Sequence, residues 1–129
     1  MENRKLIIVV FISGALAVTL GAFGAHGLKP YLDDIGMTTY QTANRYHFIH
    51  TLLSLIYVSM IPSGRIVFRA LLECLIGIFL FSGSLYILSL KSHFQGIPSW
   101  LGAITPLGGV IFIIAWLEGV IYFLKKLKN

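Results

Sequence analysis

The residues of this sequence that could do chemistry are few, and histidine forms the most concentrated group. His47 and His50 are three residues apart, about one helical turn, and His26 ends the preceding apolar run at a similar predicted depth. Three imidazoles can bind Zn²⁺ or copper and leave an open position. They can instead hold a proton or small ligand, since unperturbed histidine titrates near neutral pH. A third interpretation is a structural hydrogen-bond network that fixes the register of the helices.

These histidines lie on a polar face of one predicted helix. Polar side chains recur along it at spacings of three and four residues, which places them on one side. Such side chains within a bilayer face the interior of the bundle or a wet cavity. We therefore predict a polar cluster between helices in the outer half of the membrane. Its expected members are His26, Tyr40, Tyr46, His47, His50, Ser82, Ser84, Tyr86 and Thr105.

A second group consists of charged residues at inner depth. Glu118 is the only acid deep in the last apolar run, while Arg69 and Glu73 are one turn apart in the run before it. Carboxylates inside a membrane are costly and are functional-site hypotheses by default. We predict a structural ion pair or a charged trio between these two runs. A proton pathway to the histidines is an alternative, although apolar residues separate the two groups.

Recognisable enzyme motifs are missing from the sequence. It contains no Gly-rich phosphate loop, Walker motif, serine nucleophile elbow or HExxH, so we expect neither an enzyme nor a cofactor. Asp33 and Asp34 are adjacent, and their side chains diverge. An enzyme acting on lipid stays an alternative, with these acids near His26 and His47 at the outer surface. The single cysteine, Cys74, excludes an internal disulfide and is expected to pack as a small apolar residue.

Helices in a membrane must position these side chains. Apolar runs cover residues 6–25, 43–61, 70–90 and 105–124, and about 20 residues at 1.5 Å rise cross a bilayer core about 30 Å thick. With 57% apolar and 12% charged residues, the chain has no soluble way to cover so many runs. The sequence predicts one domain, 1–129, an all-α integral membrane bundle of four helices.

Local signals predict where these helices begin and end. Pro30 closes the first helix, and we expect an interfacial loop over about residues 28–42. A short turn at 62–65 makes the second and third helices antiparallel neighbours. Thr105 as cap and Pro106 as first helical residue predict the start of the fourth helix.

The basic residues predict the orientation of the chain. Seven of the ten lysines and arginines fall in the two termini and the second loop, which share one side of a four-span protein. The positive-inside rule then places both termini in the cytoplasm. The first run is too long for a cleaved signal peptide. Because the basic residues sit at the ends of runs, the net charge of +5 indicates headgroup contact and not nucleic-acid binding.

Small residues predict close contacts between helices. Ser13, Ala17, Gly21 and Ala25 recur at every fourth position of the first run, and small residues let membrane helices approach closely. The last run offers a second set at Gly108, Ala115 and Gly119. The spacing leaves open whether the partner helix belongs to the same chain.

Four stretches carry a family resemblance. They are Gly-Ala-Phe-Gly-Ala-His-Gly-Leu at 21–28, Tyr-Gln-Thr-Ala-Asn-Arg-Tyr-His at 40–47, Phe-Ser-Gly-Ser-Leu-Tyr at 81–86 and Ala-Ile-Thr-Pro-Leu-Gly-Gly at 103–109. In this order and spacing the chain resembles the small bacterial membrane proteins catalogued as domain of unknown function number 423, to which eukaryotic transmembrane protein 256 is related. The resemblance implies a four-span inner-membrane protein and implies no reaction.

Two functional hypotheses follow. The first is an accessory or assembly protein that binds a larger membrane protein or a second copy of itself, motivated by the small residues of the first run. The alternative is a small carrier or binding protein for a proton, metal ion or small solute, with His26, His47 and His50 lining an outer site.

Overall fold

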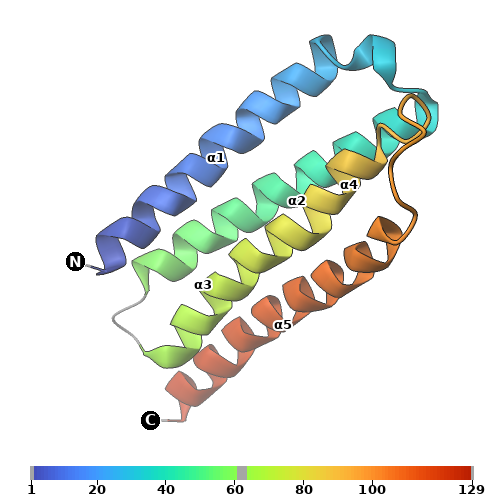
Figure 1. Cartoon of the computed structure of the whole chain (residues 1–129). Coiled ribbons are helices and arrows are strands. Elements are labelled where there is room, and N and C mark those ends of the chain that lie inside the picture. Colours follow the sequence, from blue (N-terminus) through green and yellow to red (C-terminus); the bar gives the residue numbers. More distant parts are fainter. Residues whose placement is uncertain (1, 61–63, 129) are drawn as a thin grey trace.

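The computed structural model of the chain describes residues 2–60 and 64–128, and within them all regular structure is helical (Figure 1). The elements are α1 (Glu2–His26), the short η1 (Lys29–Tyr31), α2 (Asp34–Ser59), α3 (Arg65–Gly77), η3 (Ile78–Ser82), α4 (Gly83–Leu88) and α5 (Leu101–Leu127). Segments α3, η3 and α4 follow one another without a break and form one long helix. The predicted all-α helical fold is confirmed.

Helix α2 begins earlier than the sequence pattern predicts. Asp33 caps it, because its carboxylate Oδ1 accepts a hydrogen bond from the Gly36 amide at 2.6 Å. The expected loop over 28–42 is therefore wrong beyond Asp33, since residues 34–42 are helical. Gly36 fits here because its backbone lies against the Ser89 carbonyl, where a side chain would collide. The polar residues after Asp34 mark helix near the membrane surface and not loop.

Helix α5 also begins before its predicted start at Thr105 and Pro106. Turns from Pro98 lead directly into the helix, with the Leu101 amide bonded to the Pro98 carbonyl at 3.3 Å. Pro106 is then the sixth helical residue, and its missing amide leaves one carbonyl of the first turn without a helical partner. Thr105 does not cap the helix, because its hydroxyl pairs with Ser84 at 2.7 Å. The contact with Ser84 therefore occupies the hydroxyl that the sequence pattern assigns to capping.

The long third helix contains a π-helical segment, η3, near its middle. An extra residue per turn changes the direction in which the following side chains point, and such segments are frequent at functional sites. Before it, Gly77 packs against Phe112 of α5; at it, the Phe81 backbone lies against Gly108. After it, Tyr86 reaches α2 while Ser84 still faces α5. The π-helical segment therefore allows the same long helix to contact both α2 and α5.

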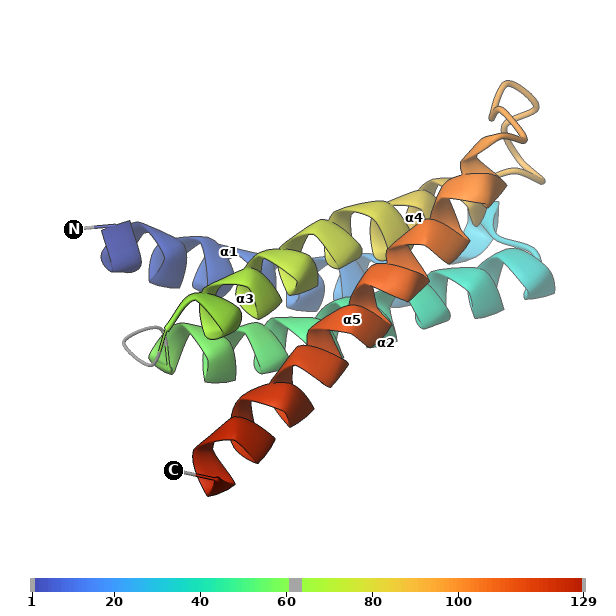
Figure 2. The same ribbon diagram turned by 90° about the horizontal axis from the view of Figure 1, so that it is seen from below.

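The helices pack side by side, with α2 and the α3–α4 helix between α1 and α5 (Figures 1 and 2). Figure 2 shows α5 crossing the others at a steep angle. Both termini lie at the same end of the bundle (Figure 1), while the side of the membrane that this end faces stays a prediction. The turn expected at 62–65 falls partly on residues 61–63, outside the described residues.

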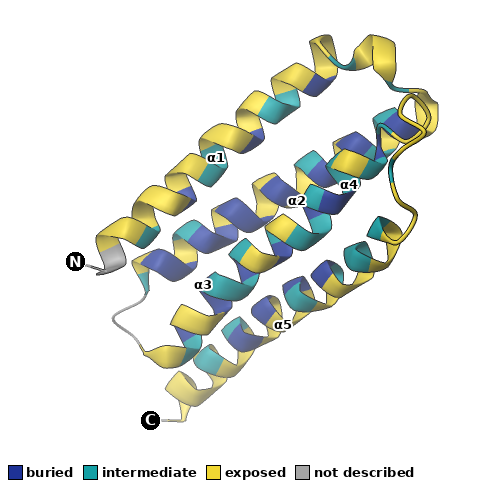
Figure 3. Ribbon diagram, viewed as in Figure 1, coloured by how far each residue is buried: buried dark blue, intermediate teal, exposed yellow. Residues whose placement is uncertain are grey.

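Large apolar side chains are exposed on the helices, as lipid contact requires. Figure 3 shows how exposed and buried positions are distributed along each helix. Within the described residues, three helical segments are long and apolar enough to cross a membrane: Arg4–His26, Arg65–Leu88 and Leu101–Leu127. Helix α2 has 26 residues but is less apolar, because its inward face carries buried polar side chains. Among them are His47, His50, Thr51 and Ser54. The polar residues of the protein are therefore concentrated where helices surround them.

Candidate functional site: two polar regions between the helices

The first polar region, which we call the histidine network, joins α1, α2 and α4. His47 Nε2 lies 3.1 Å from the Ser13 hydroxyl and His47 Nδ1 lies 3.3 Å from the Tyr86 hydroxyl. Ser13 also pairs with Thr51 at 2.9 Å. Asn44 donates from Nδ2 to the Ala17 carbonyl at 2.8 Å and to the Tyr86 hydroxyl at 3.0 Å. Both ring nitrogens of His47 are thus engaged in a closed set of hydrogen bonds.

His50 belongs to a different contact, between α2 and α5. Its Nδ1 lies 2.8 Å from the Tyr46 carbonyl, which can only accept, and its Nε2 lies 3.3 Å from the Trp116 indole nitrogen, which can only donate. The geometry therefore assigns a neutral ring with its proton on Nδ1. The ring stacks on Phe112 with centroids 3.4 Å apart. His50 is held on both nitrogens and on one face.

The two histidines do not form one site. Residues three apart on an α-helix differ by about 60° in direction, and this offset sends His47 toward α1 and α4 but His50 toward α5. His26 is exposed at the end of α1 and joins neither. Among residues 2–60 and 64–128, no group of three or more histidines, cysteines and acids could hold a metal ion. The metal interpretation of His26, His47 and His50 therefore has no support in the geometry.

The remaining members of the predicted polar cluster are spread over several contacts. The Tyr40 hydroxyl donates to the Leu20 carbonyl at 2.7 Å, and its ring meets Tyr86 edge-on with centroids 4.9 Å apart. Tyr46 is exposed, with its ring 4.7 Å from that of Phe81. Of the other hydroxyls in the predicted cluster, that of Tyr86 contacts His47, whereas Ser84 pairs with Thr105 and the buried Ser82 hydroxyl has no partner among the described residues.

The second polar region, which we call the carboxylate region, consists of Arg69, Glu73 and Glu118. Arg69 on α3 forms an ion pair with Glu118 Oε1 on α5, which is one of the arrangements that the sequence predicts. Glu118 has a side chain only 6% exposed, whereas that of Arg69 is 64% exposed. One oxygen of each acid, Glu118 Oε2 and Glu73 Oε2, is buried and has no hydrogen-bond partner. This region is not fully satisfied by protein groups.

The small residues are used for contacts within the chain. Ser13 and Ala17 face α2 through the bonds to His47, Thr51 and Asn44, and Gly21 leaves room for the Asn44 side chain. Ala25 is exposed. On α5, Gly108 lies against the Phe81 backbone, while Ala115 and Gly119 lie against Tyr57, whose hydroxyl donates to the Ala115 carbonyl at 2.7 Å. The sequence spacing did not identify the partner helices, and the structure shows that they are α2 and η3 of the same chain.

Sequence reasoning missed three contributors to these regions. Asn44 and Thr51 lie three and four residues from His47, so their spacing would have found them beside it. Trp116 carries an indole donor within an apolar run, where it resembles an interfacial anchor. Its position in the sequence does not indicate the contact with His50.

Comparisons with known proteins agree with the fold and leave the chemistry open. A family model described as "Protein of unknown function (DUF423)" matches residues 20–109. The chain is similar to the UPF0382 membrane protein YwdK of Bacillus subtilis, with 44% identity over 96% of this chain and 99% of the relative. It is also similar to the UPF0382 inner membrane protein YgdD of Escherichia coli, with 38% identity over 98% of this chain and 96% of the relative.

A UPF0382 membrane protein of Haemophilus influenzae is 36% identical over 92% of this chain and 91% of its own length. No solved structure matches the chain significantly. The relatives' names place such proteins in membranes, in agreement with the apolar helices described above. The chain therefore belongs to the DUF423 family of membrane proteins of unknown function.

Proposed function

We propose that this protein is a membrane accessory or assembly protein that binds another membrane protein or a second copy of itself. The observation that carries the proposal is the outward face of α1. Ala15, Thr19 and Ala22 are exposed there at spacings of four and three residues, which places three small side chains on one side of the helix. A surface of this kind lets a second helix approach closely.

The inner small residues of α1 cannot be the association face, because they are covered by α2. Ala17 is fully buried, and its carbonyl accepts the Asn44 hydrogen bond. The proposed association face is therefore not the one formed by Ser13, Ala17 and Gly21, but the one formed by the exposed small residues of α1. The Thr19 hydroxyl donates to the Ala15 carbonyl at 2.8 Å, so it needs no partner in lipid.

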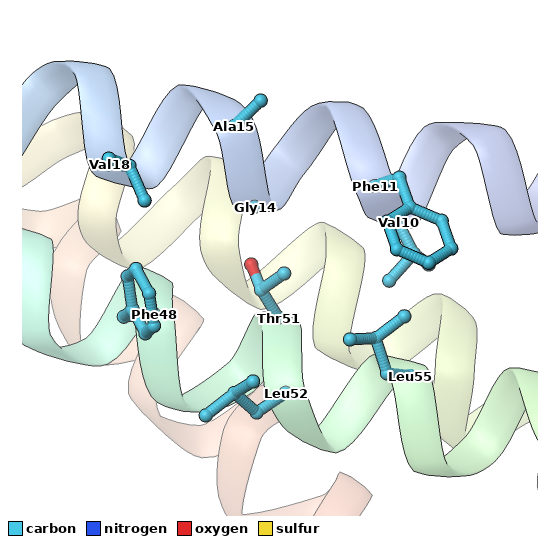
Figure 4. A pocket seen from close by; sticks show the side chains of 9 residues that line it. All are labelled: Val10, Phe11, Gly14, Ala15, Val18, Phe48, Thr51, Leu52 and Leu55. Atoms are coloured by element: carbon cyan, nitrogen blue, oxygen red, sulfur yellow. The ribbon is translucent and has the colours of Figure 1, made fainter.

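A groove of about 330 Å³ runs beside this face, between α1 and α2 (Figure 4). Its lining is apolar apart from Thr51, and Gly14 opens its floor against that residue. Ala15 points away from α2, so it lies at the rim (Figure 4). A bulky apolar side chain of a second helix would fit such a groove, and the backbone of that helix would pack against the small residues. This pairing of groove and small face supports assembly over catalysis.

The alternative function, a carrier that uses the outer histidines, has less support. A ligand would have to displace hydrogen bonds at both nitrogens of His47 and of His50. Buried polar groups that are fully paired stabilise a structure and leave no valence for a ligand. We therefore assign these two side chains to helix registration.

The test is a double substitution, Ala15→Leu with Ala22→Leu, followed by native mass spectrometry of the protein released gently from its own membrane. We expect the added subunit or the second copy to be lost while the helices remain folded. Ala103→Leu is the matched control, since Ala103 is exposed at the start of α5. An assembly that survives the double substitution, or a wild-type chain that is released alone, contradicts the proposal.

A further inference from the structure

The carboxylate region lies between α3 and α5, where Glu118 is buried and Glu73 is half-buried. Glu118 is seven residues before Lys125, which at 1.5 Å per residue places it about 10 Å along α5 from the basic end. Glu73 is eight residues into α3, after Arg65. The residues around them form the apolar core of this half, with Leu71, Cys74 and Ala115 fully buried. A charge at this depth is expensive unless a partner neutralises it.

This region contains one more carboxylate than it has basic side chains in close contact. Arg69 neutralises Glu118 by direct contact. The other basic residues at this end are exposed; they are Arg4, Lys5, Arg65, Lys125, Lys126 and Lys128. Glu73 has no ion-pair contact among the described residues, although it is one turn from Arg69. Its buried Oε2 has no hydrogen-bond donor either. The region therefore holds two acids and one close cation.

Among residues 2–60 and 64–128, no neighbouring group donates a hydrogen bond to the buried Oε2 of Glu73. From α2, Tyr57 lies near Glu73, but its hydroxyl already donates to the Ala115 carbonyl. From α3 itself, the neighbours are Arg69 and the Cys74 thiol, which lies against Ser54. From α5, the group that reaches this level is Glu118, whose Oε2 is an acceptor and not a donor. A small cation bound here would balance the extra charge.

We propose that Glu73 is a proton-binding site: its carboxylate takes up one proton from the aqueous side at the basic end of the bundle and becomes a neutral carboxyl, while Glu118 stays ionised beside Arg69. The proton is the cation that fits. Metal ions of the hard type take about six or more oxygen ligands, and the two acids, with Tyr57 engaged elsewhere, offer far fewer.

This site is independent of the association face on α1, so either proposal can fail alone. It also differs from the histidine network, where hydrogen bonds within the protein satisfy both ring nitrogens of His47. A polar residue between the two regions, Ser54, donates its hydroxyl to the His50 carbonyl at 2.7 Å. That bond ends at the backbone, so we assign proton binding and not a proton pathway.

The experiment uses dicyclohexylcarbodiimide, an apolar reagent that modifies protonated carboxyls from the lipid phase. The full-length protein in lipid nanodiscs is treated over a range of pH, and the modified residue is located by peptide mass spectrometry. We expect an adduct on Glu73 that declines as pH rises, and loss of this adduct in Glu73→Gln. A wild-type protein without an adduct on Glu73 at any pH, or one that Na⁺ protects at constant pH, overturns the proposal.

A second variant tests the role of Arg69 in the same assay. In Arg69→Gln the Glu118 carboxylate loses its cation, so we expect a new adduct on Glu118 in addition to the one on Glu73. Infrared spectra provide a readout that needs no reagent: a carbonyl band of a protonated carboxyl should be present in wild type and absent in Glu73→Gln. If the band persists in Glu73→Gln, the proton belongs to another group and the assignment is wrong.

Discussion

The histidine network and the carboxylate region are built from the same kinds of helix contact, yet they differ in completeness. In the histidine network, Ser13 and Tyr86 satisfy His47 on both nitrogens, and Asn44 donates to the Tyr86 hydroxyl. In the carboxylate region, one oxygen of Glu73 and one of Glu118 remain without a partner. A saturated set of hydrogen bonds fixes helix register, whereas an unsatisfied buried acid requires something from outside. Residue type alone would have pointed to the histidines.

The largest loss of stability is expected for a substitution at Gly108, where α5 packs against η3. A Cβ at this position would lie 2.5 Å from the Phe81 backbone nitrogen, so Gly108→Ala must separate the helices. We expect a loss of about 2–3 kcal/mol in unfolding free energy, measured by denaturant titration in detergent micelles. Gly109→Ala is the control, because its Cβ would make ordinary contact at 3.6 Å. Equal losses in the two variants would contradict this packing.

A smaller effect is expected at His47. His47→Ala leaves the Ser13 and Tyr86 hydroxyls without their imidazole partner, and we expect a loss of about 1–2 kcal/mol in the same titration. His26→Ala should change little, because His26 is exposed. Carbodiimide modification of Glu73 should be the same in both variants. If His47→Ala abolished it, the two regions would act as one site and the comparison would fail.

The smallest loss of stability is expected at Thr105, which joins α5 to α4 beside the histidine network. Thr105→Val removes the 2.7 Å hydrogen bond to Ser84 but keeps the shape of the side chain. Hydrogen bonds between membrane helices contribute about 0.6 kcal/mol on average, and we expect a loss of this order. Thr38→Val is the matched control, because the exposed Thr38 hydroxyl bonds only within its own helix. A loss above that of His47→Ala would place the main contact here instead.

The sequence predicts the helices better than it predicts their neighbours. Apolar runs of about 20 residues follow from bilayer thickness, and the Arg69–Glu118 pair follows from the depth of each residue along its helix. The start of α5 was missed because Thr105 and Pro106 imitate a cap, while the Ser84 contact that occupies Thr105 is far away in sequence. Local chemistry cannot show which distant side chain competes for a hydroxyl.

The direction of individual side chains was the other limit. His47 and His50 fall within one polar face by spacing, but their offset around α2 divides them between different helices. The small residues of α1 raised the same difficulty, since spacing shows a contact face without its partner. In both cases the missing information is how α2 is rotated about its own axis, and that depends on all its neighbours together.

The polar character of α2 has a consequence for how the protein is made. A helix with buried His47, His50, Thr51 and Ser54 enters lipid less readily than the more apolar helices beside it. Its partners Ser13 and Tyr86 lie on α1 and α4, and Trp116 lies on α5, which is synthesised after α2. We therefore expect α2 to be held stably in lipid only once α5 has been made and the helices have packed together.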